Sequence, residues 1–535
     1  MRVFLLTSAL AAVLMSVGGC GSKTTDSPDA GVVDAVVGDT NRPMCAAACD
    51  VGQRCCVATG GCVAVDPATL CEAGLVCDEA SITIDASCTA SCASCTDGRG
   101  ILATYLDLAA SDSSLLISGY SNGRADGEPL GDLVVGRATD ASSPITWETV
   151  DGVPAGPGWR GGSTDPADDV GRWSSIVAIG SDVWVASYDA THGALRIAHH
   201  DGAVWSSYTL DDEGDAGRYA SLVVDATGRL AVAYAAVLPG ADADVPFTTG
   251  RVMVARASAT EPSSAADWSR TTVSAAAIAC TAGCAAGEQC FATGGCRAPS
   301  TDCLDPCTAG LACSAGECSW IVEESTLTTE YPLAAAWTRL AATSSGLAVI
   351  WHDGRAGRGV LRGASLDGSI WSPPFTIEGQ EGGTVFGNSG NGADIAVDAL
   401  DRWHVSFVDD SRRRVRYALI EAGVVTFRAT VDDGSADLDG VRFPEGAHRV
   451  GGSTSISLDE NLIRIAYQDQ SAHDLRVAER VDGSATGWAI VASDRIDYAG
   501  LWPSSIVRDG ASVIVSQWRA DAAEDRGGVR FLSVE

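Results

Sequence analysis

Five aspartates with similar surroundings are the residues of this chain best suited to binding a ligand. Each follows an aromatic residue within three positions, after a run of alternating apolar residues such as VWVASY before Asp189. Such runs are typical of strands, so acids at equivalent strand ends form an arc on one face of a repeated fold. The alternative is that each Asp accepts backbone N–H hydrogen bonds within its own turn. The predicted ligand-binding residues are Asp189, Asp353, Asp409, Asp469 and Asp521.

Two patterns have metal-ligand spacing. Residues 435–440 resemble the start of a calcium loop, but Glu445 falls one residue short of the position that closes such a loop. Cys92-x2-Cys95 has the spacing of zinc ligands, yet no histidine lies near it in the sequence. We therefore predict no metal site and no cofactor, with calcium as the alternative at the loop. No GxSxG, Walker or dinucleotide fingerprint is present, and we predict no catalytic residue.

The first twenty residues have the features of an export signal. Arg2 precedes an apolar stretch over residues 4–17, which is too short to span a membrane. The small residues Val17-Gly18-Gly19 then precede Cys20. This ending resembles the lipobox of bacterial lipoproteins, and the resemblance implies that Cys20 carries a diacyl anchor. In that family Asp after the cysteine favours the inner membrane, so Gly21 favours the outer membrane of the cell envelope.

The charge of the chain excludes nucleic acid as a partner. The formal net charge is −33, with 69 acidic against 36 basic residues, which repels phosphate backbones and anionic headgroups. Residues 21–43 hold Ser, Thr, Asp and Gly without an aromatic residue, as expected of a tether. The partners we expect are the membrane, through the lipid, and an envelope protein or glycan.

Nineteen cysteines indicate an oxidising compartment. Apart from Cys20 they form two even-numbered groups, and ATGGC and C-x-AGL-x-C recur in both, which indicates an internal duplication. We predict that each group closes its own disulfides, with the pairing left open. The first group is Cys45, Cys49, Cys55, Cys56, Cys62, Cys71, Cys77, Cys88, Cys92 and Cys95. The second is Cys280, Cys284, Cys290, Cys296, Cys303, Cys307, Cys313 and Cys318.

The remainder of the chain repeats a unit of about 45 to 60 residues, the period of propeller blades. Each unit contains an apolar run ending on an aromatic residue, and most continue into another run and then Trp or Phe. Four such strands make a blade that must bury both faces against its neighbours. We predict an all-β, seven-bladed propeller, within a range of six to eight. The marker aromatics are Tyr120, Tyr188, Tyr234, Trp351, Phe407, Tyr467 and Trp518.

These repeats predict the organisation of the whole chain. The signal peptide covers 1–19, the lipidated tether 20–44 and the first cysteine module 45–98. Blades 1–3 cover 99–279, the second module is inserted at 280–318, and blades 4–7 cover 319–535. The last unit lacks an outer strand, so we expect a segment from the N-terminal side, residues 81–86, to complete it.

Several units look like the repeats of sialidase-like propellers. Ser365-x-Asp367-Gly368 followed by Trp371 approximates an Asp-box turn, although the tryptophan comes one residue early. In that family the turn is structural, so the resemblance supports the fold and not catalysis. The arginine triad and Tyr–Glu pair of those enzymes cannot be placed here. We predict a binding or interaction module that is not an enzyme, with a sialidase-like glycoside hydrolase acting on surface glycans as the alternative.

Overall fold

The computed structural model describes most of the repeat region and a few short strands elsewhere. The described residues are 53–56, 61–64, 101–125, 128–157, 167–242, 245–277, 289–290, 296–297, 311–314, 317–320, 335–354, 359–381, 384–385, 387–435, 446–481, 483, 487–495, 498–519 and 527–534. Within them no helix is long and apolar enough to cross a membrane.

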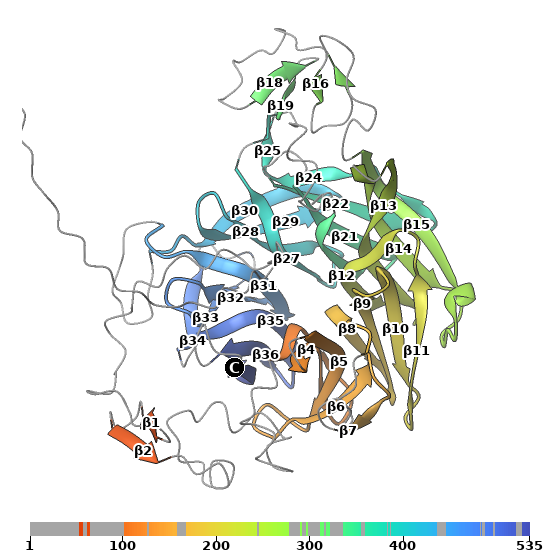
Figure 1. The fold of residues 1–535 in the computed structure, drawn as a ribbon. Helices are drawn as coiled ribbons and strands as arrows, with labels where there is room; N and C mark the ends of the chain where they lie inside the picture. Colours follow the sequence, from red (N-terminus) through yellow and green to blue (C-terminus); the bar gives the residue numbers. More distant parts are fainter. Residues whose placement is uncertain are drawn as a thin grey trace, which may run out of the picture. The chain divides into compact units, whose positions relative to one another are not determined.

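Seven antiparallel sheets form the blades of a β-propeller, which confirms the predicted fold class (Figure 1). In each blade the first strand lies nearest the axis. Blades 1 to 3 are β3 (Ile101–Ala110), β4 (Leu115–Ala125), β5 (Glu128–Ala138), β6 (Thr146–Asp151), β7 (Gly156–Pro157); β8 (Val170–Ile179), β9 (Asp182–Asp189), β10 (Ala194–His200), β11 (Trp205–Asp211); and β12 (Asp215–Val224), β13 (Leu230–Asp242), β14 (Val245–Ala257), β15 (Trp268–Ala277). A short 3-10 helix, Ala265–Asp267, precedes β15.

Blades 4 to 7 follow the same order. They are β20 (Ala336–Ala342), β21 (Gly346–Asp353), β22 (Val360–Asp367), β23 (Ile370–Trp371), β24 (Phe375–Glu378); β27 (Ser389–Val397), β28 (Trp403–Asp409), β29 (Arg414–Glu421), β30 (Val424–Asp432); β31 (Val450–Asp459), β32 (Leu462–Asp469), β33 (Asp474–Val481), β34 (Ala489–Asp494); and β35 (Tyr498–Arg508), β36 (Ala511–Arg519), β37 (Gly527–Val534). A separate two-stranded sheet joins β25 (Gln380–Glu381) to β26 (Thr384–Val385).

The seven marker aromatics all lie on second strands and are buried, as the repeat predicted. Their exposed fractions do not exceed 3%. Tyr467 packs with Val415 and Tyr417 of the preceding blade, and Tyr234 packs with Trp184 in the same way. One apolar cluster contains both Trp518 and Leu115, so it joins blade 7 to blade 1. The aromatics therefore fill the seams between blades.

Several turns between strands contain an aspartate that accepts backbone hydrogen bonds. Asp225, between β12 and β13, accepts the backbone N–H groups of Thr227 (2.8 Å) and Arg229 (3.1 Å). Asp201, before the fourth strand of blade 2, accepts those of Ala203 and Val204, both at 2.9 Å. These Asp residues close tight turns, and backbone hydrogen bonds to Asp201 lower the pKa of its carboxyl.

The two cysteine groups each contain short hairpins. β1 (Gln53–Cys56) pairs with β2 (Gly61–Ala64), and in the second group β16 (Gln289–Cys290) pairs with β17 (Cys296–Arg297) and β18 (Leu311–Ser314) with β19 (Glu317–Trp320). The register places Cys55 opposite Cys62, and Cys290 opposite Cys296. The duplicated sequences thus form equivalent hairpins, and the second group lies in the chain between blades 3 and 4.

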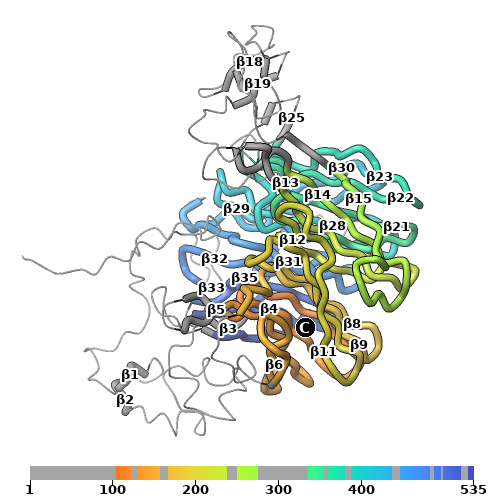
Figure 2. Tube along the Cα trace, turned by 45° about the vertical axis from the view of Figure 1, so that its right-hand side comes forward, coloured from red at the N-terminus to blue at the C-terminus, as the bar shows by residue number. Residues whose placement is uncertain are grey.

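Several predictions concern residues outside the described part of the chain. These are the signal peptide, lipidation of Cys20, the tether, the loop 436–445, Asp521 and the proposed closing segment 81–86. The cysteine side chains are likewise outside it. Blade 7 has three described strands, as the missing outer strand predicted. Figure 2 shows this last blade, in dark blue, beside the orange first blade.

Candidate ligand-binding site at the propeller axis

The four described acids of the predicted arc lie at the same end of their blades. Asp189, Asp409 and Asp469 each pair with the first residue of the innermost strand of their own blade. Asp353 ends β21, next to His352, which pairs with the first residue of β20. All four are buried, with exposed fractions of at most 5%.

The oxygens of these acids already accept hydrogen bonds from the protein. Asp469 Oδ1 accepts the N–H groups of Ser471 (2.9 Å) and Ala472 (3.1 Å), and Asp189 Oδ1 accepts that of His192 (3.0 Å). These acids thus accept backbone N–H groups within their own turns, as the alternative interpretation expects. A role of the acids in ligand binding stays a prediction. Bases face the second oxygens: His192 at 2.9 Å from Asp189, Arg362 at 2.8 Å from Asp353, Arg412 at 3.3 Å from Asp409 and Arg476 at 2.5 Å from Asp469.

One group among the described residues has the composition of a metal site. A ligand atom from each of Asp168, Asp189 and His192 lies within 4.8 Å of the others. His192 Nδ1 lies 2.9 Å from Asp189 and 4.0 Å from Asp168. The hydrogen bond to Asp189 and the charges of both acids raise the pKa of His192. Arg196 lies 4.0 Å from the same Asp189 oxygen, so a histidine and an arginine of the protein both face this acid.

The sequence analysis missed a set of five aromatic residues on innermost strands, which we call the axial aromatics. All adopt left-handed backbone angles, which bulky residues rarely do. Each coincides with a register shift between its strand and the second strand, as in a β-bulge. The axial aromatics and their φ angles are Tyr105 (55°), Trp173 (49°), Tyr219 (55°), Trp337 (53°) and Trp502 (50°).

Glycines two residues earlier explain how several of these bulges fit against the neighbouring blade. A Cβ atom on Gly171 would lie 2.7 Å from Leu133 Cα, and one on Gly500 would lie 2.8 Å from Leu475 Cα. Both glycines also have positive φ, 115° and 79°. The innermost strand therefore approaches the third strand of the preceding blade more closely than a side chain permits.

The axial aromatics form a closed circuit of ring contacts. Each ring tilts or stacks against the next, at the centroid spacings typical of aromatic pairs. Trp337 and Trp502 close the circuit although blades 5 and 6 lie between them in the chain. The centroid distances are 5.2 Å (Tyr105–Trp173), 4.9 Å (Trp173–Tyr219), 5.5 Å (Tyr219–Trp337), 5.8 Å (Trp337–Trp502) and 4.5 Å (Trp502–Tyr105).

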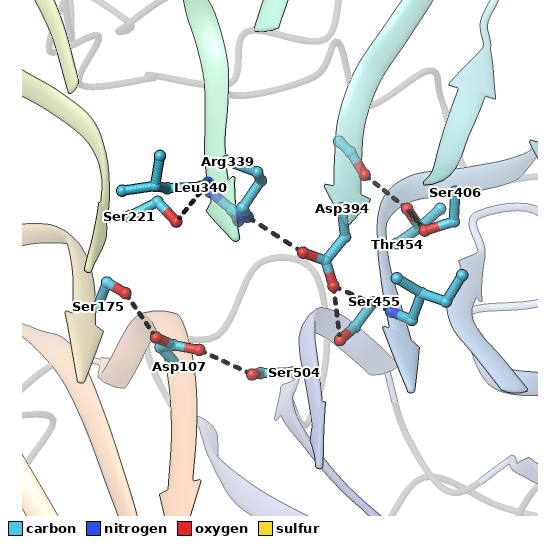
Figure 3. A network of polar contacts seen from close by, with 12 residues as sticks. Asp107, Ser175, Ser221, Arg339, Leu340, Asp394, Ser406, Thr454, Ser455 and Ser504 are labelled. Atoms are coloured by element: carbon cyan, nitrogen blue, oxygen red, sulfur yellow. Dashed lines mark hydrogen bonds and ion pairs between the residues drawn. The ribbon is translucent and has the colours of Figure 1, made fainter. Parts of the chain in front are cut away.

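Two residues farther along each innermost strand, polar side chains form a second ring that joins neighbouring blades (Figure 3). We call Asp107, Ser175, Ser221, Arg339, Asp394, Ser455 and Ser504 the polar ring. Six of them accept a backbone N–H group from the next blade: Ile176 to Asp107 (2.9 Å), Leu222 to Ser175 (3.0 Å), Leu340 to Ser221 (3.0 Å), Ile456 to Asp394 (2.9 Å), Ser505 to Ser455 (2.9 Å) and Leu108 to Ser504 (3.1 Å). Arg339 instead faces Asp394 at 3.7 Å, so every seam is bridged.

The polar ring contains two carboxylates and one guanidinium. Asp107 accepts four hydrogen bonds from neutral donors, among them the hydroxyls of Ser175 (2.8 Å) and Ser504 (2.9 Å). Burial raises the pKa of Asp394, an effect that Arg339 opposes and the charge of Asp107 reinforces. When both acids are ionised the ring has a net negative charge.

Comparison with known proteins finds only distant similarity. No family model matches this chain, and no curated protein matches it. Among solved structures, the polysaccharide lyase Uly1 is 10% identical over 88% of this chain and 95% of its own, with a TM-score of 0.41. The endosialidase of phage phi92 is 10% identical over 82% and 68%, with a TM-score of 0.38. A protein of unknown function from Dyadobacter fermentans is 8% identical over 82% and 96%, with a TM-score of 0.39.

The axial aromatics differ in exposure and in their neighbours. Trp173 and Tyr219 are each 6% exposed, whereas Tyr105, Trp337 and Trp502 are only partly buried. The guanidinium of Arg218 lies 5.4 Å from the centroid of Trp173, within cation–π distance. The ring surface nearest to solvent is thus on blades 7, 1 and 4.

A sequence signal for this site exists in the innermost strands. GRWSS (171–175), GRYAS (217–221) and GLWPS (500–504) share a glycine, an aromatic residue two positions later and a polar residue two positions after that. Blade 5 has GNGAD (390–394) and blade 6 has GGSTS (451–455), which lack the aromatic residue. The repeat was recognised from the buried aromatic residues of the second strands. The pattern of glycine, aromatic residue and polar residue on the innermost strands was therefore not predicted.

Proposed function

We propose that this chain is a lipid-anchored binding protein of the bacterial cell envelope, on the outer membrane, and that its ligand binds at the axial aromatics. The observation that carries the proposal is the left-handed conformation of five large aromatic residues. A left-handed conformation of a bulky residue destabilises the fold by about 1–3 kcal/mol per residue. Such conformations tend to persist where function requires them.

Closure of the propeller does not require these aromatics. Blades 5 and 6 have Gly392 and Ser453 at the equivalent position, and the polar ring still bridges their seam through Asp394 and Ile456. A residue type that the fold can omit, but that five blades keep in a strained conformation, supports a role in recognition. The acids Asp353, Asp409 and Asp469 lie toward the same end of the blades and would contribute to the rim of such a site.

Ligand binding is tested with the purified full chain in detergent against a panel of envelope oligosaccharides, peptides and small metabolites. We expect at least one ligand whose binding is lost in Trp502→Ala and retained in Trp205→Ala, which removes a tryptophan from an outer strand. Ligands that bind both variants as they bind the wild type would contradict the location of the site.

Anchoring is tested by metabolic labelling with palmitate and by membrane fractionation. Cys20→Ala should abolish labelling and release the protein from membranes, because no other acceptor cysteine follows a lipobox. Gly21→Asp is the matched control, since it should keep the label and move the protein to the inner membrane. Labelling of Cys20→Ala would overturn the anchor.

A second candidate function is glycoside hydrolysis, favoured by the two carboxylates of the polar ring. Glycosidases use a pair of acids, one with a raised pKa, and burial raises the pKa of Asp394 near Asp107. The test is hydrolysis of chromogenic glycosides by the wild type, Asp394→Asn and Asp107→Asn. Activity that both substitutions abolish would favour the enzyme over the binding protein.

A further inference from the structure

The outer edge of blade 7 is open among the described residues. There β37 pairs with β36 alone, whereas the third strand of each other blade pairs with a fourth strand as well. An open strand edge presents N–H and C=O groups that another strand can pair with. Propellers keep such edges short and protected, so the edge of β37 calls for a partner.

Strand pairing shows which residues of β37 correspond to those of the other third strands. In blade 2, the second-strand residue that pairs with Arg172 also pairs with Leu195 on the third strand. In blade 7, the second-strand residue that pairs with Leu501 also pairs with Val529. Arg172 and Leu501 each directly precede an axial aromatic. Val529 therefore corresponds to Leu195.

Apolar side chains of β37 are less buried than their counterparts in other blades. Phe531 and Leu532, two and three positions after Val529, are only partly buried. The residues at these two positions in blades 2 and 3 are at most 1% exposed, namely Ile197, Ala198, Val254 and Ala255. Apolar surface on β37 is thus left for a further strand to cover.

The fourth strands of blades 1, 2, 4 and 5 end on the same kind of triplet, a threonine, an aliphatic residue and an acid. In each blade the acid pairs with the third-strand residue that corresponds to Leu195, and the threonine pairs with the residue after it. The aliphatic residue between them is the extra residue of a β-bulge. The triplets are Thr149-Val150-Asp151, Thr209-Leu210-Asp211, Thr376-Ile377-Glu378 and Thr430-Val431-Asp432.

The aliphatic residue of each triplet fills the seam toward the next blade. Val150, Leu210, Ile377 and Val431 are at most 9% exposed, and each belongs to an apolar cluster with members from two neighbouring blades. The cluster between blades 7 and 1 includes Val529, and Phe531 packs against it. An aliphatic residue at the same position of blade 7 would join this cluster.

A fifth triplet of this kind is Thr83-Ile84-Asp85. Threonine followed by Val, Leu or Ile and then by an acid occurs five times in the whole sequence, and the other four occurrences end fourth strands. Residues 86–100 connect the triplet to the innermost strand of blade 1, as 212–214 connect β11 to β12 and 433–449 connect β30 to β31. The triplet therefore has the place in the chain that a fourth strand of blade 7 requires.

We propose that residues 81–86 pair antiparallel with β37 as the fourth strand of blade 7, with Asp85 opposite Val529 and Thr83 opposite Arg530. The sequence repeat gave only the segment, and the register follows from the pairing that the other blades share.

In this register Ile84 is the bulged residue and packs in the seam between blades 7 and 1, where it covers Phe531. The same seam contains the ring contact between Tyr105 and Trp502, with centroids 4.5 Å apart. The strand from the N-terminal side thus holds the first and last blades together where the axial circuit closes.

Hydrogen–deuterium exchange of the full chain, followed peptide by peptide, tests this strand. In the wild type, the amides of residues 82–85 should exchange at least about tenfold more slowly than those of an unstructured peptide. Ile84→Glu should speed exchange about tenfold both there and in β37, because it places a charge in an apolar seam. Ile82→Glu is the matched control and should change neither, since Glu148 holds the corresponding position of blade 1 and is partly exposed.

Exchange of residues 82–85 at the rate of an unstructured peptide in the wild type would overturn the proposal. Equal effects of the two glutamate substitutions would do the same, because they differ only in the predicted burial. Should Ile84→Glu unfold the chain, Ile84→Ala is the milder variant, and it should still speed exchange in both segments several-fold.

A photoreactive p-benzoylphenylalanine in place of Ile82 identifies the strand that the segment contacts. Cross-links to β37 within one chain are expected. Cross-links to β37 of a second copy would show that the strand is exchanged between chains, and cross-links only to the cysteine hairpins would place the segment elsewhere. Either of these results would contradict the proposed pairing.

Discussion

At the axis the propeller has two sectors that are built differently. In the aromatic sector, blades 7, 1, 2, 3 and 4, innermost strands meet through tilted or stacked ring contacts. In the glycine–serine sector, blades 5 and 6, they meet backbone to backbone, since a Cβ on Gly392 would lie 2.4 Å from Ser453 Cα. The same position of the repeat is therefore an aromatic residue in five blades and Gly392 or Ser453 in the other two.

The glycine–serine sector has a buried ion network that reinforces its seam. Arg476 lies 3.1 Å from Asp432 of blade 5 and 2.5 Å from Asp469 of its own blade, and Tyr467 donates to Asp432 at 2.8 Å. His448 lies 2.6 Å from Asp469. Arg476, Asp432 and Asp469 are nearly inaccessible to solvent.

Both sectors keep the same polar ring although their axial residues differ. A backbone N–H group crosses the seam in both, from Leu108 to Ser504 (3.1 Å) in one sector and from Ile456 to Asp394 (2.9 Å) in the other. A polar contact bridges the seam between neighbouring blades throughout the propeller. The aromatic residue, by contrast, is present in five blades and absent from blades 5 and 6.

The largest loss of stability is expected from substitutions at glycines where strands of neighbouring blades approach closely, in both sectors. Gly500→Ala should destabilise the protein by about 4 kcal/mol, because its Cβ meets the Leu475 backbone at a positive φ. Gly451→Ala should cost less, since its Cβ meets the side chain of Val408. Gly510→Ala is the control: its φ of 78° matches the 79° of Gly500, but no atom lies within 4 Å of its Cβ. Urea unfolding measures all three, and equal losses would contradict the packing argument.

The second prediction breaks the ion network of the glycine–serine sector. Asp469→Asn should cost about 3 kcal/mol at neutral pH, because it leaves Arg476 buried without one of its partners. Burial opposes ionisation of Asp469, but His448 and Arg476 outweigh it and lower the pKa of this carboxyl. A lowered folded pKa gives stability that is complete above the ordinary value of 3.8 and lost as pH falls through the folded pKa. The difference between wild type and variant should therefore shrink in acid, and a constant difference from pH 7 to pH 3 would show that the charge is not responsible.

The third prediction compares residues at the equivalent position of the two sectors. Trp502→Ala should cost about 2 kcal/mol through lost ring contacts, and Trp502→Gly about 1 kcal/mol less than Ala, because glycine relieves the left-handed strain. Ser453→Ala should change stability by less than about 0.5 kcal/mol. The free energies of unfolding check the order, and a glycine variant less stable than the alanine variant would argue against strain.

The smallest effect concerns the polar ring. A raised folded pKa for Asp394 means that its stability contribution falls as pH rises from the ordinary 3.8 through the folded value. Asp394→Asn removes this loss while an amide oxygen still accepts from Ile456, so the variant should gain on the order of 1 kcal/mol over wild type at pH 7. Thermal unfolding at pH 4 and pH 7 measures the gain, which should be smaller at pH 4. Ser221→Ala, which removes from the same ring the hydroxyl that accepts from Leu340, should show no such pH dependence.

Much of the fold was predictable because its signal is local. Alternating runs that end on Tyr188, Tyr234 or Phe407 gave the second strands and hence the number of blades. The ligand-binding role of Asp189, Asp409 and Asp469 stays a prediction. Whether such an acid contacts a ligand or closes its own turn depends on hydrogen bonds that residue type does not specify.

The repeat, its strand periodicity, the strongly acidic charge and the two cysteine groups can be read from the amino-acid sequence, since they depend on neighbouring residues or on composition. The residues that meet at the axis cannot, because they come from distant parts of the chain. Tyr105 and Trp502 are separated by nearly the whole repeat region, yet their rings meet because seven blades close a circle. The left-handed backbone of Trp173 and Trp502 lies where the innermost strand packs closely on the preceding blade, a contact that residue type alone does not specify.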